Sequence, residues 1–412
     1  MVLATVVIVG FAAFALRSTG GHPTAKSAKT AAPADPGVTA TRAAALDLAR
    51  QPAARFTGNL TTTAGVQIPV ALTVTNAGTT IGRVMSASSR IEILVMSGRT
   101  FFKADPKFWT GAGASATRAT RYASRWVRIE AGYIGIDPEQ RLAPRVLSAQ
   151  LLEAAKSSKS IGAPVSRNGV QARPVTIPQA TVYVSTEAPY RVVHIETETT
   201  QAPGDGITPA AYADDSGFDL DVDPLTEPDA ASLFAGLKVN VSRLLTAIDS
   251  QVDFDLDGSV VLAPCTARGC TATATLGNTL RGSDTYVRTD RPIIVEVLVA
   301  FTLDARPIRS CTDVVTMTAN GKTKTSCRVT YSLPADGTSH TIRAKVSGFA
   351  RAVSASDVSA MTADLDRQTL AWRVRQAGDS GLPDASIGNG TYQFRPPATY
   401  SPAAGPLSQV DG

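Results

Sequence analysis

The stretch that most constrains the fold is Val66–Trp109, in which short apolar runs alternate with turn residues and no helical period occurs. Its first run, Val66–Thr75, places apolar residues at every second position, which is the period of a β-strand with one buried face. Three more runs follow at Thr79–Ser86, Arg90–Met96 and Arg99–Ala104. Because the connections between them are short, consecutive strands should be antiparallel. The stretch therefore predicts a β-meander.

One run of this meander, Arg90–Met96, carries apolar residues on both faces. Successive side chains of a strand point to opposite sides of the sheet. Ile91, Ile93 and Val95 therefore share one side, and Leu94 and Met96 share the other. An antiparallel sheet with one face in water is polar on that face. We therefore expect other elements to cover both faces of this part of the sheet.

The rest of the first half of the chain predicts further strands and a few helices. Strands are expected at Ala53–Thr62, Trp126–Ile129, Val165–Ile177, Thr181–Thr186, Arg191–Thr199 and, as an edge strand, Phe218–Val222. Helices are expected at Thr41–Gln51, Pro144–Lys156 and Glu227–Leu237, with a loop at Thr110–Thr120 and a hinge near Asn240–Ser250. The helix at Pro144–Lys156 starts with a proline and carries a broad apolar stripe of the kind that packs on a sheet.

The second half predicts an all-β module. Short apolar runs recur at Val252–Leu256, Val260–Ala263, Thr271–Leu276, Ile293–Leu303, Val314–Thr318, Thr325–Tyr331 and Thr341–Val346. Such spacing is typical of a β-sandwich, which is Ig-like in architecture only, since no tryptophan lies between the cysteines. A last helix begins near Ser356, with Val358, Met361, Leu365, Thr369 and Trp372 on one face. The proline-rich stretch Gly378–Gly412 should be disordered.

The segments Thr73–Trp109, Arg125–Ile129 and Thr181–Glu196 resemble the actinobacterial lipoproteins of the LppX/LprG type. The likeness spans about residues 41–237 and consists of pattern rather than of a catalytic signature. The resemblance implies a LolA-like fold, in which a curved antiparallel half-barrel and helices enclose a lipid-accepting cavity. Members of that family carry a lipidated cysteine near the start, and this chain has none there, so lipidation is not implied.

The meander and the helix at Pro144–Lys156 together predict the wall of such a cavity. The candidate lining residues are Ile68, Val70, Leu72, Ile91, Ile93, Val95 and Phe102 on the strands, with Leu147 and Leu151 on the lid helix. The same residues would be ordinary core if the interior were tightly packed. An open pocket and a packed core are thus alternatives at this point.

The predicted fold class is α+β, a curved antiparallel half-barrel with helices followed by an all-β sandwich. The predicted segments are a signal anchor or signal peptide (1–16), a flexible linker (17–40), the LolA/LppX-like domain (41–240), the Ig-like sandwich (250–352), a helix (353–377) and a disordered tail (378–412).

Charge and motifs argue against nucleic-acid binding and catalysis. The net charge of +5 comes from 40 basic and 35 acidic residues that are scattered along the chain, so no basic tract predicts a nucleic-acid partner. The three histidines, His22, His194 and His340, are not grouped with a nucleophile by any known motif. His194 lies on a predicted strand, opposite to its neighbours, and is interpreted as a surface or lid position. We expect no catalytic residue, no metal and no cofactor.

Four cysteines, Cys265, Cys270, Cys311 and Cys327, cluster in the second half of the chain. An even, clustered set in an exported chain predicts two disulfides, and the spacings do not match the usual zinc knuckle. We predict the pairs Cys265 with Cys270 and Cys311 with Cys327. For the second pair we expect a hairpin whose loop, at about Met317–Gly321, is wide enough to place the two cysteines opposite each other.

The N-terminal segment Val2–Leu16 has no charged residue and is followed by Arg17. As a helix it would be about 22 Å long, shorter than the ~30 Å hydrocarbon core of a bilayer. Either it is a signal peptide cleaved after Ala13-Phe14-Ala15, or it is the end of a signal anchor whose start lies upstream. We favour the anchor.

The expected function is that of an exported, membrane-tethered, non-enzymatic protein that binds a lipid or another hydrophobic molecule at the cell envelope. Its expected location is extracytoplasmic, anchored to the cell membrane through the N-terminal segment or secreted. The alternative is an adhesion or presentation scaffold that binds no lipid and contacts the cell wall or a cell-envelope protein partner. The presence of a co-purified lipid distinguishes the two.

Overall fold

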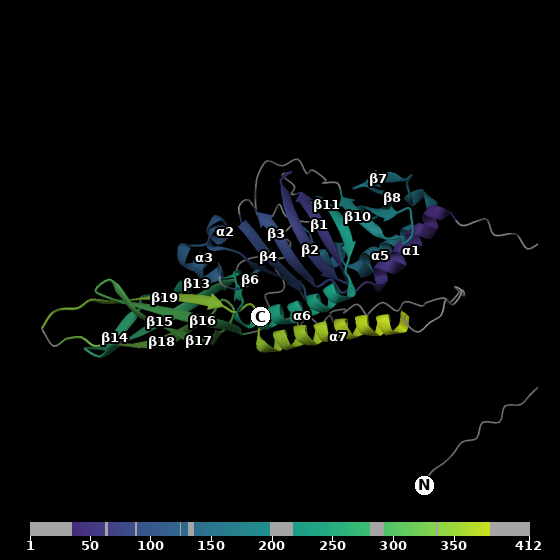
Figure 1. Cartoon of the computed structure of the whole chain (residues 1–412). Coiled ribbons are helices and arrows are strands. Elements are labelled where there is room, and N and C mark those ends of the chain that lie inside the picture. The colour runs from purple at the N-terminus through teal and green to yellow at the C-terminus, as the bar shows by residue number, and fades with distance from the viewer. Residues whose placement is uncertain are drawn as a thin grey trace, which may run out of the picture. The chain divides into compact units, whose positions relative to one another are not determined.

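The computed structural model describes residues 35–61, 65–86, 89–123, 125–130, 136–197, 217–280, 292–334 and 337–379 (Figure 1). The chain divides into two compact units, Met1–Asp35 and Pro36–Gly412, and every element below belongs to the second. Its class is α+β, as predicted. Among the described residues, no helix is long and apolar enough to cross a bilayer. The expected N-terminal anchor and C-terminal disordered tail lie outside the described residues, except that the last helix, α7 (Ala355–Asp379), includes the first two residues of the expected tail.

Twelve strands form one open sheet in the order β12-β6-β5-β4-β3-β2-β1-β11-β10-β9-β8-β7. Neighbouring strands are antiparallel, except that β12 runs parallel to β6. The strands are β1 (Ala53–Thr61), β2 (Gln67–Thr75), β3 (Thr80–Ser86), β4 (Ser89–Met96), β5 (Arg99–Lys103), β6 (Val127–Ile129), β7 (Val165–Arg167), β8 (Val170–Ile177), β9 (Ala180–Ser185), β10 (Val192–Thr197), β11 (Gly217–Pro224) and β12 (Ile248–Asp249).

The predicted meander is confirmed, since β2, β3, β4 and β5 pair with one another in chain order. The turn between β4 and β5 consists of Ser97 and Gly98, both with positive φ (52° and 68°). Two residues of this kind form the type of turn whose twist matches that of an antiparallel hairpin. The local sequence therefore sets the register of this hairpin.

Both faces of β4 are covered, as its sequence predicts. Ile91, Ile93 and Val95 belong to one apolar cluster, and Leu94 and Met96 belong to another. We call the side of the sheet that carries the first group the interior face and the side that carries the second group the outer face.

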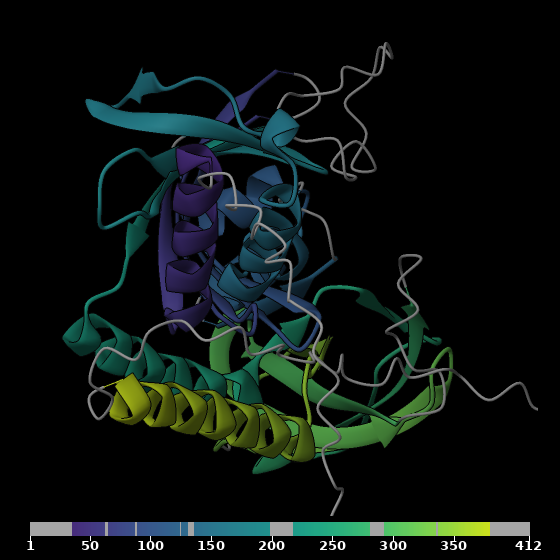
Figure 2. The same cartoon turned by 90° about the vertical axis from the view of Figure 1, so that its right-hand side faces the viewer.

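Two pairs of helices cover these faces. On the interior face, α1 (Pro36–Arg50) and α5 (Pro144–Ala154) contribute Ala44, Leu48, Leu147 and Leu151 to the first cluster. On the outer face, α6 (Glu227–Arg243) and α7 (Ala355–Asp379) lie side by side (Figures 1 and 2). Their Phe234 and Trp372 rings stack with centroids 5.8 Å apart. The covering helices come from distant parts of the chain, 36–50 and 355–379.

The expected loop at Thr110–Thr120 instead contains the end of α2 (Pro106–Gly111) and most of α3 (Ala116–Ala123). Asp105 caps α2 by accepting a hydrogen bond from the Phe108 backbone N–H at 2.7 Å, and a proline occupies its first turn. The rings of Trp109 and Tyr122 then hold the two helices together, edge to face, at 5.3 Å. These helices are too short to produce a readable 3.6-residue period. By contrast, the short helix α4 (Pro138–Arg141), which precedes α5, is predicted by the Asp137 cap and the first-turn Pro138, and the structure has both.

Three other expectations are corrected. The strand Phe218–Val222 is not at an edge, because β11 lies between β1 and β10. The run Val165–Ile177 is a hairpin of β7 and β8, since Asn168 and Gly169 both have positive φ and form its turn. Residues 36–40, assigned to the linker, belong to helix α1.

The expected hinge near Asn240–Ser250 is also corrected. Helix α6 continues to Arg243, a 3-10 turn follows at Leu244–Thr246, and β12 then joins the large sheet. Ser250 donates two hydrogen bonds to the backbone oxygen of Arg128, from its N–H at 3.2 Å and from its hydroxyl at 2.7 Å. Because this connection is bonded to β6 at several points, it is not free to bend.

The remaining seven strands form two further sheets that share one apolar cluster. In one sheet β15 pairs with β13, β14 and β18, and in the other β16 lies between β17 and β19. The strands are β13 (Val252–Leu256), β14 (Val261–Thr266), β15 (Gly269–Leu280), β16 (Ile293–Leu303), β17 (Arg306–Met317), β18 (Lys322–Thr330) and β19 (Ile342–Ala350). Each overlaps one of the seven runs that the sequence predicts.

Both predicted disulfides are present, Cys265–Cys270 and Cys311–Cys327, and the described residues contain no free cysteine. The first lies between the paired strands β14 and β15. The second does not span a hairpin as expected, because Cys311 on β17 and Cys327 on β18 belong to different sheets. The connecting loop, 318–321, therefore carries the chain from one sheet to the other, and the disulfide links the two sheets.

Replacing Cys311 and Cys327 together by serine should lower the free energy of unfolding by about 3 kcal/mol, since the disulfide closes a loop of 16 residues. The shorter Cys265–Cys270 loop should contribute about 2 kcal/mol. Urea unfolding of the two double variants measures the difference. Equal losses in both would show that loop closure is not the main contribution of these disulfides.

Candidate functional site

All nine residues predicted to line a cavity are gathered on the interior face. Eight of them are buried members of one apolar cluster, and Ile68 packs against it from a partly exposed position. The strand residues lie on β2, β4 and β5, and Leu147 and Leu151 approach from α5. Side chains separated by as many as 83 residues in the sequence, from Ile68 to Leu151, thus belong to the same apolar region.

The centre of this region is closed. Leu72, Ile93 and Leu151 each have 0% of their surface accessible, so no space the size of a water molecule touches them. Phe102 and Leu147 are 1% accessible. Among the described residues, these buried side chains leave no open space for a ligand at the centre of the region.

The rim of the region is open along β2. Val66, just before this strand, is 58% exposed, Ile68 is half-buried, Val70 is 6% exposed and Leu72 is fully buried. Ile68, Val70 and Leu72 occupy alternate positions of β2 and therefore share its interior face, and Val66 directly precedes the strand. A continuous apolar track leads from the surface into the interior, and we call these four residues the β2 track.

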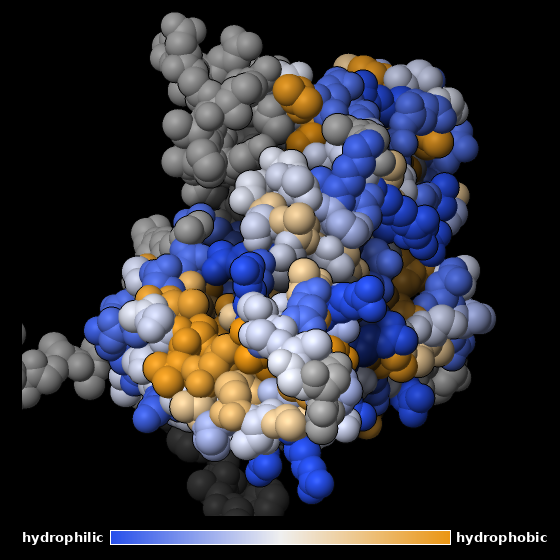
Figure 3. All heavy atoms as spheres, turned by 90° about the vertical axis from the view of Figure 1, so that its left-hand side faces the viewer, coloured by the Kyte–Doolittle hydropathy of each residue, from blue (hydrophilic) through white to orange (hydrophobic). Residues whose placement is uncertain are grey.

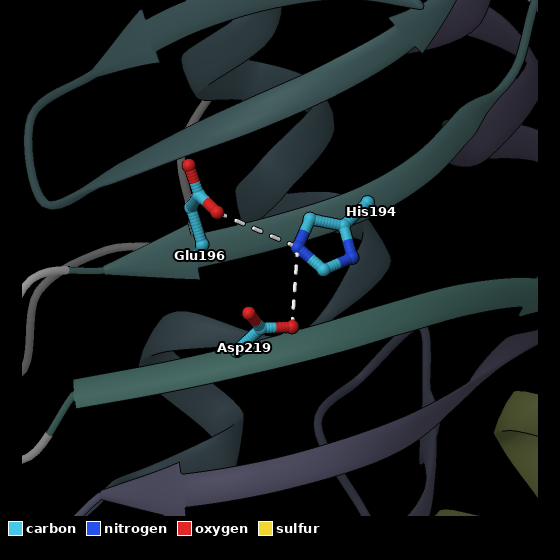
Figure 4. A group of neighbouring side chains, drawn as sticks. All are labelled: His194, Glu196 and Asp219. Carbon is cyan, nitrogen blue, oxygen red and sulfur yellow. Dashed lines mark ion pairs between the residues drawn. The ribbon is translucent and has the colours of Figure 1, made fainter. Parts of the chain in front are cut away.

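A second, polar site lies on the opposite side of the sheet, on β10 and β11. His194 is 2% exposed and faces Glu196 on its own strand and Asp219 on the next (Figure 4). Its Nε2 atom is 3.4 Å from a carboxylate oxygen of Asp219 and 3.7 Å from one of Glu196. Its Nδ1 atom is 2.9 Å from a carboxylate oxygen of Asp221. The interpretation of His194 as a surface position is therefore wrong, although it does point away from Ile195, which is in the interior cluster.

A hairpin tip covers this polar site. Arg167, at the end of β7, donates to His194 Nε2 at 3.0 Å and pairs with both Glu196 and Asp219. The adjacent Asn168 donates to Asp221 at 2.5 Å. The turn at Asn168 and Gly169 directs the side chains of Arg167 and Asn168 toward β10 and β11. A turn signal in the local sequence thus determines that these two side chains cover His194.

Tyr183 on β9 completes the surroundings of His194. Its ring contacts the imidazole edge to face at 5.4 Å, and its hydroxyl donates to Glu196. Burial raises the pKa of the Tyr183 phenol, and the hydrogen bond to Glu196 raises it further. The phenol is therefore protonated at neutral pH and serves as a hydrogen-bond donor. A cavity of about 230 Å³ adjoins the site, lined by Arg167, Asn168, Arg191, His194, Asp221 and Asp223 among others.

The structure also connects His340 to a hydroxyl and a carboxylate. Its Nδ1 atom is 2.8 Å from Asp304, and its Nε2 atom is 3.0 Å from the Thr338 hydroxyl. This order of groups is that of a hydrolase triad. However, Asp304 and Thr338 are exposed, His340 is half-buried, and the Asp304 carboxylate also accepts from the Thr341 N–H at 2.8 Å. We interpret the group as a brace between two loops.

The polar site was not found from the sequence, although part of its signal is there. His194 and Glu196 are two residues apart on one strand, and Asp219, Asp221 and Asp223 alternate on another, so each set shares a face. Residues 198–216 lie between the two strands, and no turn motif fixes the register across them. Only the pairing of His194 with Asp221 and of Glu196 with Asp219 brings the two sets together.

Comparisons with known proteins leave the family open. No protein-family model matches this chain, and no curated protein matches it. Among solved structures it aligns with an exo-β-1,3-galactanase from Phanerochaete chrysosporium, solved with β-1,3-galactotriose, at 6% identity over 69% of this chain and 77% of that one. The TM-score is 0.10, and a likeness of this size carries no argument about fold or activity.

Proposed function

We propose that this chain binds a lipid or another apolar molecule between the interior face of its large sheet and helices α1 and α5. The observation that carries the proposal is the β2 track, which leads from the exposed Val66 at the rim through Ile68 and Val70 to the buried Leu72. An acyl chain that follows this track exchanges water for apolar contacts at every step, which is favourable by about 0.8 kcal/mol per buried methylene.

The arrangement of the large sheet supports the same proposal. An open sheet of mainly antiparallel strands with helices on its interior face is what a LolA-like half-barrel of the LppX/LprG type requires. The two smaller sheets with a common core are compatible with the Ig-like sandwich. The disulfides indicate an oxidising, extracytoplasmic environment. Attachment to the membrane through residues 1–16 is part of the proposal.

Uptake requires the closed interior to open. Ala143, which precedes α5, makes no side-chain capping hydrogen bond, and its backbone oxygen accepts from the N–H groups of Val146 and Leu147 at 2.8 and 3.1 Å. Displacing α5 would uncover Leu147 and Leu151, which an apolar ligand would cover again. We propose that α5 is the lid, and that apolar contacts with the ligand offset the free-energy cost of displacing it. We also propose that the protein has no enzymatic activity.

Organic extraction of the purified protein, followed by mass spectrometry, should release a lipid. The variant Val95→Trp adds bulk to the interior face and should abolish lipid binding, with a loss of about 1–3 kcal/mol in stability from overpacking. The matched control is Met96→Trp, which overpacks the outer face at the next position and should retain the lipid. Absence of lipid from the wild-type extract, together with no uptake of a fluorescent fatty acid, would reject the proposal.

One observation favours the scaffold as the second candidate function. The strands and flanking residues of the two smaller sheets expose large apolar side chains, among them Leu256 at 43%, Val261 at 56% and Val314 at 50%. Val261 and Val314 lie on different sheets, and Figure 3 shows one area of the surface in which apolar residues gather. Apolar surface of this kind often marks a protein interface. A wild-type protein without lipid that binds an isolated cell-envelope fraction, and a Val314→Ser variant that does not, would support the scaffold.

A further inference from the structure

We propose that His194, Glu196 and Asp219 form a binding site for a divalent transition-metal ion, with Zn²⁺ as the ion that fits best, and that Arg167 competes for it. The three side chains each offer one ligand atom, and these atoms all lie within 4.8 Å of one another. Imidazole nitrogen and carboxylate oxygen are ligands that Zn²⁺ takes in proteins. This inference is independent of lipid binding, since the site lies on the other side of the sheet.

The distances from the imidazole nitrogen to the two carboxylates fit a tetrahedral ion. Two atoms that each lie about 2.1 Å from a tetrahedral zinc ion are about 3.4 Å from one another. His194 Nε2 is 3.4 Å from Asp219 and 3.7 Å from Glu196. Figure 4 shows both carboxylates directed at the same ring nitrogen. Each carboxylate is therefore placed to share an ion with His194, and an ion between them would draw the two carboxylates, now within 4.8 Å of each other, into the tetrahedral spacing.

The imidazole is held in the form that binds a metal. Asp221 accepts a hydrogen bond from Nδ1 at 2.9 Å, which places the proton on that nitrogen and leaves the lone pair of Nε2 directed at the carboxylates. A carboxylate that orients the second ring nitrogen is the usual partner of a metal-bound histidine. Tyr183 orients Glu196 in the same way, because its hydroxyl donates to one oxygen of that carboxylate and leaves the other for the site.

The positively charged guanidinium group of Arg167 already occupies this position. The Nη2 group of Arg167 contacts His194 Nε2 at 3.0 Å and Asp219 at 3.4 Å, and it also pairs with Glu196, so it touches all three candidate ligands. The site therefore selects positive charge, and a metal ion can enter only when Arg167 leaves. Arg167 also lines the adjoining cavity of about 230 Å³, which offers room for its displaced side chain.

The test is calorimetric titration of the full, metal-stripped chain with zinc chloride, and with cobalt chloride for the absorption spectrum of a tetrahedral site. The wild-type protein should bind one Zn²⁺ weakly. Arg167→Met should bind it about tenfold more tightly or better, because apparent affinity falls with the fraction of molecules in which the site is free. Zinc should also raise the melting temperature of Arg167→Met more than that of the wild type.

Asp219→Asn should lose binding, and this side chain is 64% exposed, so its replacement should not disturb folding. Two matched controls should bind as the wild type does. Asp223→Asn removes a carboxylate from the same strand and face, and His340→Gln removes the other described histidine. No binding by Arg167→Met at about 1 mM zinc, or equal binding by Asp219→Asn and wild type, would overturn the proposal and leave Arg167 as part of a purely structural ion-pair cluster.

Discussion

Replacing Arg128 by methionine should lower the free energy of unfolding by about 3–5 kcal/mol, because it leaves the Asp249 carboxylate buried without its cation. Arg128 on β6 and Asp249 on β12 face each other in the parallel register of the two strands. Their side chains are each 8% exposed and joined at 3.1 Å. Methionine retains most of the apolar part of the arginine side chain. The loss of stability therefore measures the removal of the guanidinium charge. Urea unfolding at about pH 7 measures it.

The loss of stability caused by Arg128→Met should be smaller at acidic pH. Burial raises the pKa of Asp249, and Arg128 opposes this effect, so the variant should raise that pKa further. Between the unfolded-state pKa, near 3.9, and the raised native value, the native state binds more protons than the unfolded state, and stability falls as the pH rises. The deficit of Arg128→Met should therefore be larger at about pH 7 than at about pH 4.5.

A double variant, Arg128→Met with Asp249→Leu, is the matched control. Replacing both members of a buried ion pair by apolar groups is often neutral or even stabilising. The double variant should therefore recover most of the lost stability and lose the pH dependence. A single variant that unfolds like the wild type, or a deficit that does not change with pH, would contradict the buried ion pair as described.

The second large effect is expected on β5. Phe101→Ala and Phe102→Ala should each lower the free energy of unfolding by about 3–5 kcal/mol, although the two residues are adjacent and point to opposite faces. Phe101 is 0% exposed in the outer cluster, and Phe102 is 1% exposed in the interior cluster. In a sheet with one face in water, only one of two neighbouring substitutions would be costly.

Lys103→Ala on the same strand is the control. Lys103 is half-buried and 3.6 Å from Glu92, and a surface pair of this kind contributes about 0–1 kcal/mol. Chemical unfolding of the three variants should give two large losses and one small one. If Phe101→Ala behaved like Lys103→Ala, helices α6 and α7 would not form a packed cover of the outer face.

The sequence predicts this fold best where the signal is local. The alternation along β2 to β5, the Ser97-Gly98 turn and the apolar stripe of α7 can each be read from a few consecutive residues, and the structure has all three. The predicted disulfide pairs are both present, although the hairpin expected to place Cys311 opposite Cys327 does not form, since the two cysteines lie on different sheets. Short helices such as α2 and α3 are missed because six to eight residues contain too few turns for a period to appear.

The sequence could not show which strands are neighbours across long connections. The sequence predicts an edge strand at Phe218–Val222, yet β11 lies between β1 and β10, with its aspartates on the side of the sheet that carries His194. For the same reason the polar site could not be predicted from the sequence, which does not fix the register between β10 and β11. A shift of one residue would turn the Asp219 side chain away from Glu196 and His194.

By itself, then, the sequence determined the strand-forming segments, the two-sided apolar strand β4 and the residues available for an apolar interior, because side-chain alternation and turn chemistry act within a few residues. The tertiary structure decided the order of strands, the burial of His194 beneath Arg167, the link between two sheets through Cys311 and Cys327, and the closed packing at Leu72, Ile93 and Leu151. These features depend on contacts between residues far apart in the chain, whose geometry is fixed only when the whole sheet and its covering helices pack together.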